Sequence, residues 1–463
     1  MTEQLKLKLN DSKATRWGAL VIVAFTMMAA YYVNDVVAPL KTMLETDLAW
    51  SSTDFGFFTG GYSFLNVFFL MLIWGGLILD RFGIRFTGKL ATILMVGGTA
   101  LEYYAMTGLA GADATLFGIN EIFGYKTGVF VAFAGYSIFG VGAEVAGITV
   151  SKIIAKWFKG KELATAMGVQ VALARIGSQA GYAVAIPLAR AFGISTPVLL
   201  GLVLLLGGMI AFFIFAVMDK KLDKQMEAAA IAAGTEDEEE KFSFKDVKNI
   251  LVNPGFWLIA LLCVLFSSCV FPFQKFASEL MIIKYGINEN VAGTFAGLPA
   301  LGALILTPVF GGFIDKRGKS ASIMLLGSAM LICVHFIYAI PDINYWLVAI
   351  VLMIILGIAF SLVPSAMWPA VAKIFPVSQL GTAYALIFFI QNIGLWGIPT
   401  LIGWVLDAYC ISGKKPDGTN MYDYTVPMCI FTGIACLSLI VTLLLKKADK
   451  KYGYKLEEPN IQK

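Results

Sequence analysis

The chain has 463 residues, of which 58% are hydrophobic and only 14% are charged, and its mean hydropathy is +0.78. These values lie outside the range of soluble globular domains, so they exclude an ordinary soluble enzyme or binding module. The formal net charge of +4 is small for a chain of this length. The composition therefore indicates a polytopic membrane protein.

Apolar runs of the ~20 residues needed to cross a bilayer recur along the whole chain. We expect twelve spans, six on each side of one charged interruption. They cover 17–40, 52–78, 88–109, 126–152, 162–190, 195–218, 253–282, 289–313, 319–340, 344–371, 379–406 and 425–446. The expected fold class is an all-α membrane protein.

The charged interruption divides the chain into units. We expect a first six-helix unit over 1–218, a linker over 219–252, a second six-helix unit over 253–446 and a tail over 447–463. The linker contains the acidic run Thr235 to Lys241 and has no apolar periodicity. It is typical of a solvated tether with a short surface helix, and an acidic sensor is the alternative.

The distribution of basic residues predicts the orientation. Loops rich in Lys and Arg stay in the cytoplasm. The two termini and the loops after even-numbered spans hold most of the 35 basic residues. The opposite side holds Lys41, Lys126, Arg190, Lys275, Lys284, Lys414 and Lys415. We therefore expect both termini and the central linker to be cytoplasmic.

The two halves of the chain are related in sequence. Residues 157–177 align with 374–394 without a gap, and Lys156 aligns with Lys373. A charged, an aromatic, a Thr and a Gly position are all reproduced, which apolar segments seldom achieve by chance. Repeated halves are how many transporters build two gates around a central site.

A second repeated element follows the second span of each half. The chain reads Gly-Leu-Ile-Leu-Asp-Arg-Phe-Gly-Ile-Arg over 76–85 and Gly-Phe-Ile-Asp-Lys-Arg-Gly-Lys over 312–319. Gly suits a tight turn, and Asp suits a helix end. We expect the charged residues to form ion pairs across the interface of the halves and to act in gating: Asp80, Arg81, Arg85, Asp315 and Arg317. Ordinary positive-inside charge is the alternative.

The twelve spans and this loop motif resemble the major facilitator superfamily of secondary carriers over essentially the whole chain. The resemblance implies two pseudo-symmetric six-helix bundles that rock about a site at the midplane. It implies transport rather than enzymatic catalysis, without indicating the substrate. ATP-driven pumping is disfavoured, because the chain has no phosphate-binding Gly-Lys-Ser/Thr loop.

Several stretches narrow the resemblance. They include Tyr-Val-Asn-Asp at 32–35, Tyr-Ser-Phe-Leu-Asn-Val at 62–67, Gly-Ala-Glu at 142–144, Ala-Arg-Ile-Gly-Ser at 174–178 and Gln-Asn-Ile-Gly at 391–394. These are similar to the lysosomal dipeptide carriers of the superfamily. In that family, a Glu in the fourth span and an Arg in the fifth hold the termini of a dipeptide, and the matching positions here are Glu144 and Arg175. The animal relatives also use an accessory membrane glycoprotein, which this chain itself does not reveal.

The residues support the same site on physical grounds. Glu144 and Arg175 are opposite charges inside long apolar runs, and an ionisable group at membrane depth marks a functional site by default. Both lie roughly 18 to 21 Å from the cytoplasmic ends of their helices. We expect the two to pair across adjacent helices when the carrier is empty and to part for a zwitterionic substrate. A purely structural ion pair is the alternative.

Other polar residues within the spans are candidates for lining the cavity or for hydrogen bonds between helices. They are Tyr32, Asp35, Tyr62, Asn66, Gln170, Gln391 and Asn392. For Asp35 the alternatives are a contact with Lys41 or a substrate amine and a merely interfacial charge at a helix end, and Lys275 is expected to pair with Glu279 four residues later. Trp368 lies near Pro364 and Pro369, which can interrupt a helix, and its alternatives are gating, substrate stacking and plain packing.

The sequence predicts no cofactor, no metal site and no nucleic-acid partner. The six cysteines lack metal-type spacing. The predicted function is a dipeptide carrier in contact with membrane lipids, either facilitative or proton-coupled. The alternatives are a carboxylate exchanger or proton symporter and a nontransporting membrane sensor or scaffold. Short loops and the lack of a dileucine-type sorting signal favour a bacterial inner membrane.

Overall fold

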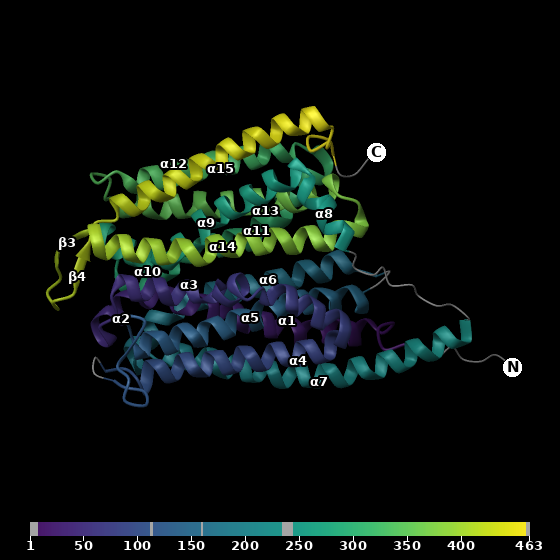
Figure 1. Cartoon of the computed structure of the whole chain (residues 1–463), viewed down its shortest axis with the longest axis horizontal. Helices are drawn as coiled ribbons and strands as arrows, with labels where there is room; N and C mark the ends of the chain where they lie inside the picture. The colour runs from purple at the N-terminus through teal and green to yellow at the C-terminus, as the bar shows by residue number, and fades with distance from the viewer. Residues whose placement is uncertain (1–7, 112–113, 159–160, 234–243, 460–463) are drawn as a thin grey trace.

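The computed structural model describes residues 8–111, 114–158, 161–233 and 244–459, and it is almost entirely helical (Figure 1). The first half holds α1 (Lys13–Val36), η1 (Ala38–Leu40), α2 (Lys41–Leu48), α3 (Ser52–Phe68), α4 (Met71–Thr107), α5 (Thr127–Trp157), α6 (Leu163–Phe192) and α7 (Thr196–Ala233). The second half holds α8 (Phe244–Val252), α9 (Pro254–Tyr285), α10 (Glu289–Ala296), α11 (Leu298–Arg317), α12 (Ser320–Ala339), α13 (Trp346–Ile374), α14 (Val377–Tyr409) and α15 (Thr425–Tyr452).

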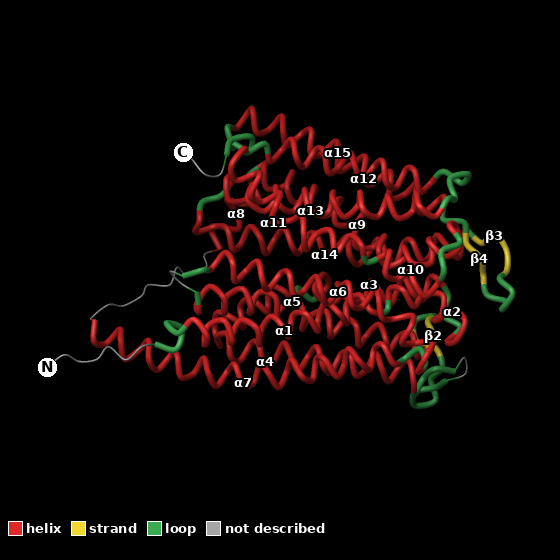
Figure 2. The backbone as a smooth tube through the Cα atoms, turned by 180° about the vertical axis from the view of Figure 1, so that it is seen from behind, coloured by secondary structure: helices red, strands yellow, loops and turns green. Residues whose placement is uncertain are grey.

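The helices form two bundles that lie side by side. In the first bundle, α4 packs on α5 and α7, and α1 packs on α6 and α7. In the second, α9 packs on α14 and α15, and α11 packs on α13. Both chain ends lie at one end of the molecule, which we call the terminus end (Figure 1). The other end carries α2 and two short β-hairpins, whose bounds are given below, and we call it the hairpin end (Figure 2).

The predicted spans agree with the helices. Within the described residues, nine helices are long and apolar enough to cross a membrane, and the bent pair α3 and α4 makes a tenth. The predicted span 88–109, most of which lies within this bent pair, and the predicted span 162–190 are also helical. Residues 88–109 correspond to the second part of α4, which follows a break at Gly83, where φ is 74°. Residues 162–190 correspond to α6, whose mean hydropathy is lowered by Gln170, Arg175 and Gln179.

Some local features differ from the sequence analysis. Helix α7 continues to Ala233, well beyond the expected boundary at 218, and the acidic run 235–241 lies outside the described residues. Two short antiparallel hairpins were not foreseen: β1 (Glu121–Ile122) with β2 (Tyr125–Lys126), and β3 (Ile411–Lys414) with β4 (Asn420–Tyr422). Helix α13 runs through Pro364 and Pro369 without an interruption, although prolines can cause one.

The closest seam between the bundles joins α3 to α14. Glycines make this approach possible, as is usual where membrane helices meet backbone to backbone. A Cβ added at Gly56 would lie 2.4 Å from the carbonyl oxygen of Pro399 and 3.0 Å from the Cα of Gly403. A Cβ added at Gly60 would lie 2.7 Å from the Oγ1 of Thr400. The seam therefore depends on the absence of side chains at these positions.

We expect Gly56→Ala to disfavour the state in which the hairpin end is closed. The added methyl group meets α14 backbone that cannot move without shifting the whole helix, and overpacking of this kind costs about 1–3 kcal/mol. A thiol-reactive reagent that cannot cross membranes should then label Ser52→Cys, at a buried position, faster when Gly56→Ala is also present than when it is not. Gly76→Ala is the matched control, because its Cβ would have no neighbour within 4 Å. Unchanged labelling in Gly56→Ala would contradict the prediction.

Candidate substrate site

The site begins with a carboxylate and a phenol in the first bundle. Glu144 lies in the middle of α5 and is partly buried. The hydroxyl of Tyr62, on α3, donates a hydrogen bond of 3.0 Å to its Oε1. One hydroxyl satisfies only part of the capacity of a carboxylate, which accepts several hydrogen bonds. Glu144 can therefore receive further donors, such as a substrate ammonium.

Arg175, on α6, lies between two aromatic rings. Its guanidinium carbon is 5.6 Å from the ring centre of Tyr31 and 4.8 Å from that of Phe360. Tyr31 belongs to α1, whereas Phe360 belongs to α13 of the second bundle. Cation–π contacts hold a guanidinium without using its N–H donors. The planar fork of Arg175 is thus positioned at the bundle interface and remains available to a carboxylate.

The expected ion pair between Glu144 and Arg175 is not present, which corrects the sequence analysis. In the described part of the chain, Arg175 makes no ion pair within 4.0 Å, and Glu144 is bonded to Tyr62 instead. The reason is the helix packing: α5 packs mainly on α4 and α3, whereas α6 packs mainly on α1. Tyr31, on α1, is within electrostatic range of both charges and of Asp35.

Asn66 adds an amide to this region. It lies one helical turn after Tyr62 on α3, and its side chain is only 1% exposed. Neither its Nδ2 nor its Oδ1 has a hydrogen-bond partner among the described residues. A buried amide without partners costs free energy, so such a group usually marks a water or ligand position. Its NH2 group can donate and its carbonyl oxygen can accept, one turn along α3 from Tyr62, the partner of Glu144.

The remaining candidates on the first bundle are dispersed. Tyr32 is buried and donates a hydrogen bond of 3.2 Å to the carbonyl oxygen of Pro197 on α7, so it packs within the bundle. Gln170 is partly buried on α6. Asp35 does not meet Lys41; its Oδ1 lies 3.1 Å from the Nζ of Lys275 on α9 instead. This contact also corrects the expected pair between Lys275 and Glu279.

Three candidates lie on the second bundle and are held by local contacts. Gln391 donates to the Oγ of Ser267 at 2.7 Å. Asn392 donates to the carbonyl oxygen of Phe388 at 2.9 Å, and its buried Oδ1 has no partner among the described residues. Trp368 stands 4.8 Å from the ring of Phe388. These contacts leave Trp368 packed against α14.

The loop motif of the first half forms ion pairs within the first bundle, not across the interface as we expected. Lys152 lies 3.0 Å from Asp80, and Arg85 lies 2.9 Å from Asp223, in the last third of α7. Arg81 lies over the neighbouring ring of Phe82 at 5.6 Å. These pairs connect the turn to α5 and α7, which belong to the same bundle.

The motif of the second half lies at the end of α11. Asp315 is partly buried and within electrostatic range of Lys373 on α13. Arg317 is exposed in the last turn of α11. A role in gating stays a prediction for both halves of the motif.

A cluster of buried charges at the hairpin end was missed by the sequence analysis. Lys41 is 1% exposed, and its Nζ lies 2.5 Å from Glu45 of its own bundle and 2.5 Å from Glu279 of the second. Lys415 lies 3.5 Å from Glu45 and 3.6 Å from Glu279, and Tyr424 donates a short hydrogen bond to Glu279. The spacing of Lys275 and Glu279 suggested a local pair, whereas the fold gives each a partner on the other bundle.

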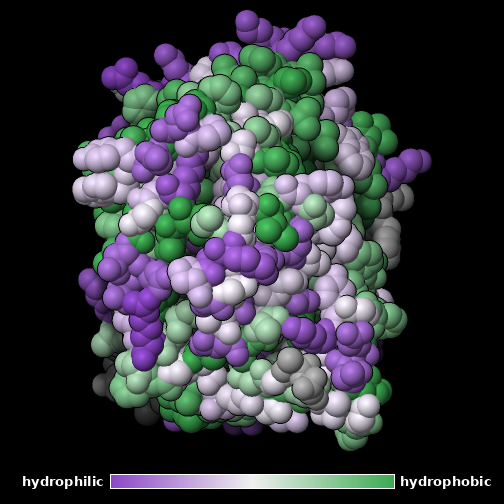
Figure 3. Space-filling model, turned by 90° about the vertical axis from the view of Figure 1, so that its left-hand side faces the viewer, coloured by the Kyte–Doolittle hydropathy of each residue, from purple (hydrophilic) through white to green (hydrophobic). Residues whose placement is uncertain are grey.

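Further polar contacts close the same end. Asp407 of α14 accepts hydrogen bonds from the first backbone amides of α3, at Ser52 (3.3 Å) and Thr53 (2.6 Å). Thr46 donates to Asp417 at the tip of the β3–β4 hairpin at 3.4 Å. The hydrogen bonds from Thr419 hold the pKa of Asp417 below its usual value. Hydrophilic side chains gather over much of this face (Figure 3).

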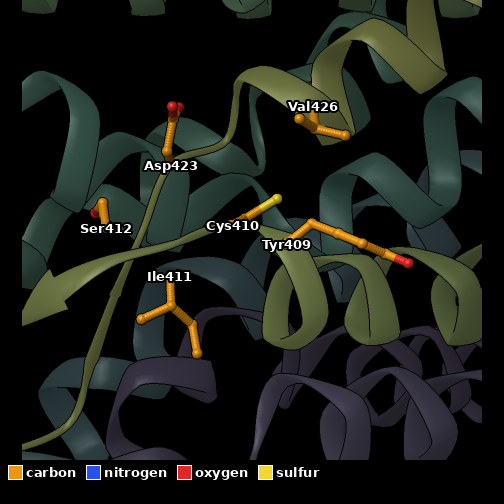
Figure 4. A pocket seen from close by; sticks show the side chains of 6 residues that line it. All are labelled: Tyr409, Cys410, Ile411, Ser412, Asp423 and Val426. Carbon is orange, nitrogen blue, oxygen red and sulfur yellow. The ribbon is translucent and has the colours of Figure 1, made fainter.

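A shallow pocket at the hairpin end is distinct from the candidate site. It measures about 160 Å³ and is lined by Tyr409, Cys410, Ile411, Ser412, Asp423 and Val426 (Figure 4). Burial raises the pKa of the Cys410 thiol to about 11. The pocket is smaller than the ~300 Å³ at which ligand sites usually begin. It contains none of the predicted substrate residues.

Comparisons with known proteins agree with this architecture. The model of the Major Facilitator Superfamily matches residues 20–397. The human lysosomal dipeptide transporter MFSD1 is 29% identical over 454 residues, which cover 95% of this chain and 88% of that protein. The chicken (Gallus gallus) protein of the same name is 33% identical over 287 residues, which cover 59% of this chain and 62% of that protein.

Solved structures of low sequence identity share the fold. The nucleoside transporter NupG superposes with a TM-score of 0.68 at 12% identity, over 92% of this chain and 98% of that one. The peptide transporter POT superposes with a TM-score of 0.67 at 14% identity, over 95% of both chains. One transports nucleosides and the other peptides, so the fold by itself does not identify a substrate.

Proposed function

Because this chain belongs to the Major Facilitator Superfamily and is an integral membrane transporter, we propose that it carries small peptides, dipeptides first, by alternating access. The observation that supports the proposal is the pair of opposite charges, Glu144 and Arg175, which lie on neighbouring parts of one bundle without neutralising each other. A free dipeptide carries one ammonium and one carboxylate, which match the two charges.

The clamp would work through the termini of the peptide. The ammonium would bind Glu144 beside the Tyr62 hydroxyl, and the carboxylate would bind the Arg175 fork in a bidentate manner. Recognition of the termini leaves the peptide side chains loosely specified and permits a broad substrate range. Because Phe360 of the second bundle contacts Arg175, binding of a carboxylate at Arg175 would also depend on the distance between the bundles.

Asn66 would distinguish a peptide from other zwitterions. Its free amide donor and acceptor complement the C=O and N–H of a peptide bond that lies between the two charges. A ligand that lacks the peptide bond would leave both Asn66 atoms unpaired. A site built to hydrogen-bond its ligand strongly rejects analogues that lack the bonding group, because the buried polar atoms of the site then have no partner.

The test is thermal stabilisation of the purified protein by a panel of ligands, since a ligand that binds only the folded state raises its apparent stability. Gly-Gly and Ala-Ala should stabilise the protein. N-acetylated dipeptides, free amino acids and dicarboxylates should not. We expect 5-aminopentanoate, which has the termini of Gly-Gly at the same spacing but no peptide bond, to bind at least tenfold more weakly, and Asn66→Leu to reduce this preference for Gly-Gly.

Each alternative function predicts a different pattern. Stabilisation by dicarboxylates and acetylated dipeptides alone would indicate a carboxylate carrier, in which Glu144 only modulates Arg175. The absence of any ligand response, together with unchanged behaviour of Glu144→Gln and Arg175→Lys, would indicate a nontransporting sensor or scaffold. Equal binding of Gly-Gly and 5-aminopentanoate would contradict the role of Asn66 while leaving the clamp intact.

We further propose that the terminus end faces the cytoplasm of a bacterium and that the two bundles, 1–218 and 253–446, are the units that rock. The Lys and Arg residues near the chain ends support this orientation. The hairpin end, with the Lys41 cluster and the α3–α14 seam, would be the outer gate and is closed in this state. We do not propose the compartment of the animal relatives, or their accessory glycoprotein, for this chain.

A further inference from the structure

A carboxylate in the third span has no role in the site described above. Glu102 lies on α4, in the last turns before the helix ends at Thr107 near the hairpin end. Its side chain is 0% exposed, and neither Oε1 nor Oε2 has a hydrogen-bond partner among the described residues. The hydroxyl of Thr99, one turn earlier, is also buried without such a partner.

The burial of Glu102 follows from close helix packing. A Cβ added at Gly135 of α5 would lie 2.8 Å from the backbone nitrogen of Glu102, and one added at Gly98 would lie 2.4 Å from the carbonyl oxygen of Gly135. The backbones of α4 and α5 are therefore nearly in contact beside the carboxyl group. No space remains for a hydration shell there. An ionised carboxylate in such a place costs several kcal/mol of free energy.

The charges around Glu102 do not compensate for an ionised form. Lys275 is within electrostatic range of Glu102, but it already pairs with Asp35 at 3.1 Å and donates to the carbonyl oxygen of Asn34 at 2.6 Å. Tyr136 of α5 is also within range of Glu102 and donates to the same Asn34 carbonyl. The single positive charge of Lys275 is thus balanced by Asp35. An ionised Glu102 would add one unbalanced negative charge.

Among the described residues, the other elements packed on α4 bring no further positive charge to the hairpin end, where Glu102 lies. These elements are α7, α3, α1 and α14. Residues 196–212 of α7 include no charged residue, and on α1 the acidic Asp35 is the charge at this end. On α3, Asp54 belongs to the first turn and is influenced by Lys126. On α14, Asp407 is bonded to the start of α3.

We propose that Glu102 is a proton-binding site whose occupation is linked to closure of the hairpin end. In the closed state, one Glu102 oxygen carries the proton as O–H. When the second bundle moves away, α9 withdraws Lys275 from Asp35, water enters, and this O–H bond breaks as its proton passes to water. Closure reverses the step and takes one proton from water. This inference rests on the proposed alternating access but not on the identity of the substrate.

The linkage has a definite sign. The closed state binds one proton more than the open state, so a lower pH favours closure, by up to about tenfold in the closed-to-open ratio per pH unit. Glu102→Gln keeps the shape of the neutral acid and cannot ionise. It should hold the hairpin end in the closed state and remove the pH dependence.

The experiment measures how fast a membrane-impermeant maleimide labels Ser52→Cys as a function of pH; this chain with Ser52→Cys is called the parent. The labelling of the chain without this cysteine is subtracted, and the pH-dependent reactivity of a free thiol serves as the reference. Ser52 is buried between the bundles, so its labelling reports opening. We expect the labelling rate, divided by the fraction of thiol that is ionised at each pH, to fall as the pH falls. In Glu102→Gln this corrected rate should be low and constant. The exposed Glu121→Gln is the matched control and should behave like the parent.

A second readout does not depend on transport or on opening. The infrared band of protonated carboxylic acids, recorded on the purified closed protein at neutral pH, should lose intensity in Glu102→Gln and not in Glu121→Gln. Identical bands in the parent and in Glu102→Gln would overturn the proposal, as would labelling that is present but equally pH-dependent in both. Labelling absent at every pH would count against alternating access as well as against this inference.

Discussion

Arg175→Ala should abolish the response to free dipeptides while the protein remains folded. Loss of one partner of a buried, hydrogen-bonded charge pair costs about 2–5 kcal/mol, which corresponds to a loss in affinity of roughly 30-fold or more. Arg175→Lys should retain only part of the affinity, because an ammonium lacks the planar fork that matches a carboxylate. The measurement is the Kd of Ala-Ala from the ligand dependence of thermal unfolding, confirmed by uptake into proteoliposomes.

A double-mutant cycle makes this result specific. Ala-Ala and its C-terminal amide are compared on the unsubstituted chain and on Arg175→Ala. If Arg175 binds the carboxylate, removal of both partners should cost little more than removal of either one. Arg190→Ala, in the last turn of the same helix, is the matched control, because its exposed contacts are with Glu289 and Asn290 rather than with the site. Additive losses in the cycle would show that Arg175 does not contact the carboxylate.

Lys41→Met should shift the carrier toward the state in which the hairpin end is open. The Lys41 ammonium is shared by Glu45 and Glu279, and its removal leaves two buried carboxylates facing each other with Lys415 as the remaining cation nearby. Breaking a buried ion pair from one side typically costs 3–5 kcal/mol. The open-to-closed ratio should therefore rise by roughly 100-fold or more, which is measured as faster maleimide labelling of Ser52→Cys.

Two further variants separate this effect from general damage. Lys284→Met removes a partly buried lysine at the same end whose Nζ donates to Tyr338 and Ile340 within the second bundle, so it should not change the labelling. Lys41→Met combined with Glu45→Gln and Glu279→Gln removes the unpaired charges and should restore part of the closed population. If the triple variant opens as readily as Lys41→Met, the ion cluster is not what holds the end closed.

Much of the architecture could be predicted from sequence because the bilayer makes span formation a local property. Backbone groups in hydrocarbon must be bonded within their own segment, so an apolar run of sufficient length becomes a helix. The predicted spans therefore match the helices closely, and the turn at Gly83 coincides with the loop motif. Glu144 and Arg175 were recognised on equally local grounds, because an isolated charge in an apolar run is conspicuous.

Glu102 is an acidic residue within an apolar run, as Glu144 is, but it is absent from the predicted site residues. It is an acidic residue in the predicted span 88–109, near the tyrosines at 103 and 104. Its lack of partners could not be read from the sequence, since it results from the contact of Gly98 with Gly135 on the next helix. The two β-hairpins were not predicted, because the strands of each are only a few residues long and their pairing depends on the connecting turn.

The membrane spans, the repeated halves, the superfamily and the residues with unusual charges can all be predicted from the sequence, because each is encoded in a short stretch of chain. The partners of those charges depend on how the helices pack. This packing separates Glu144 from Arg175, pairs Lys275 with Asp35, and joins Lys41 to Glu279 across the bundles. The physical reason is that a buried charge pairs with whichever opposite charge the helix packing brings within a few ångströms, and that packing depends on side-chain shapes and glycine contacts distributed over the whole chain.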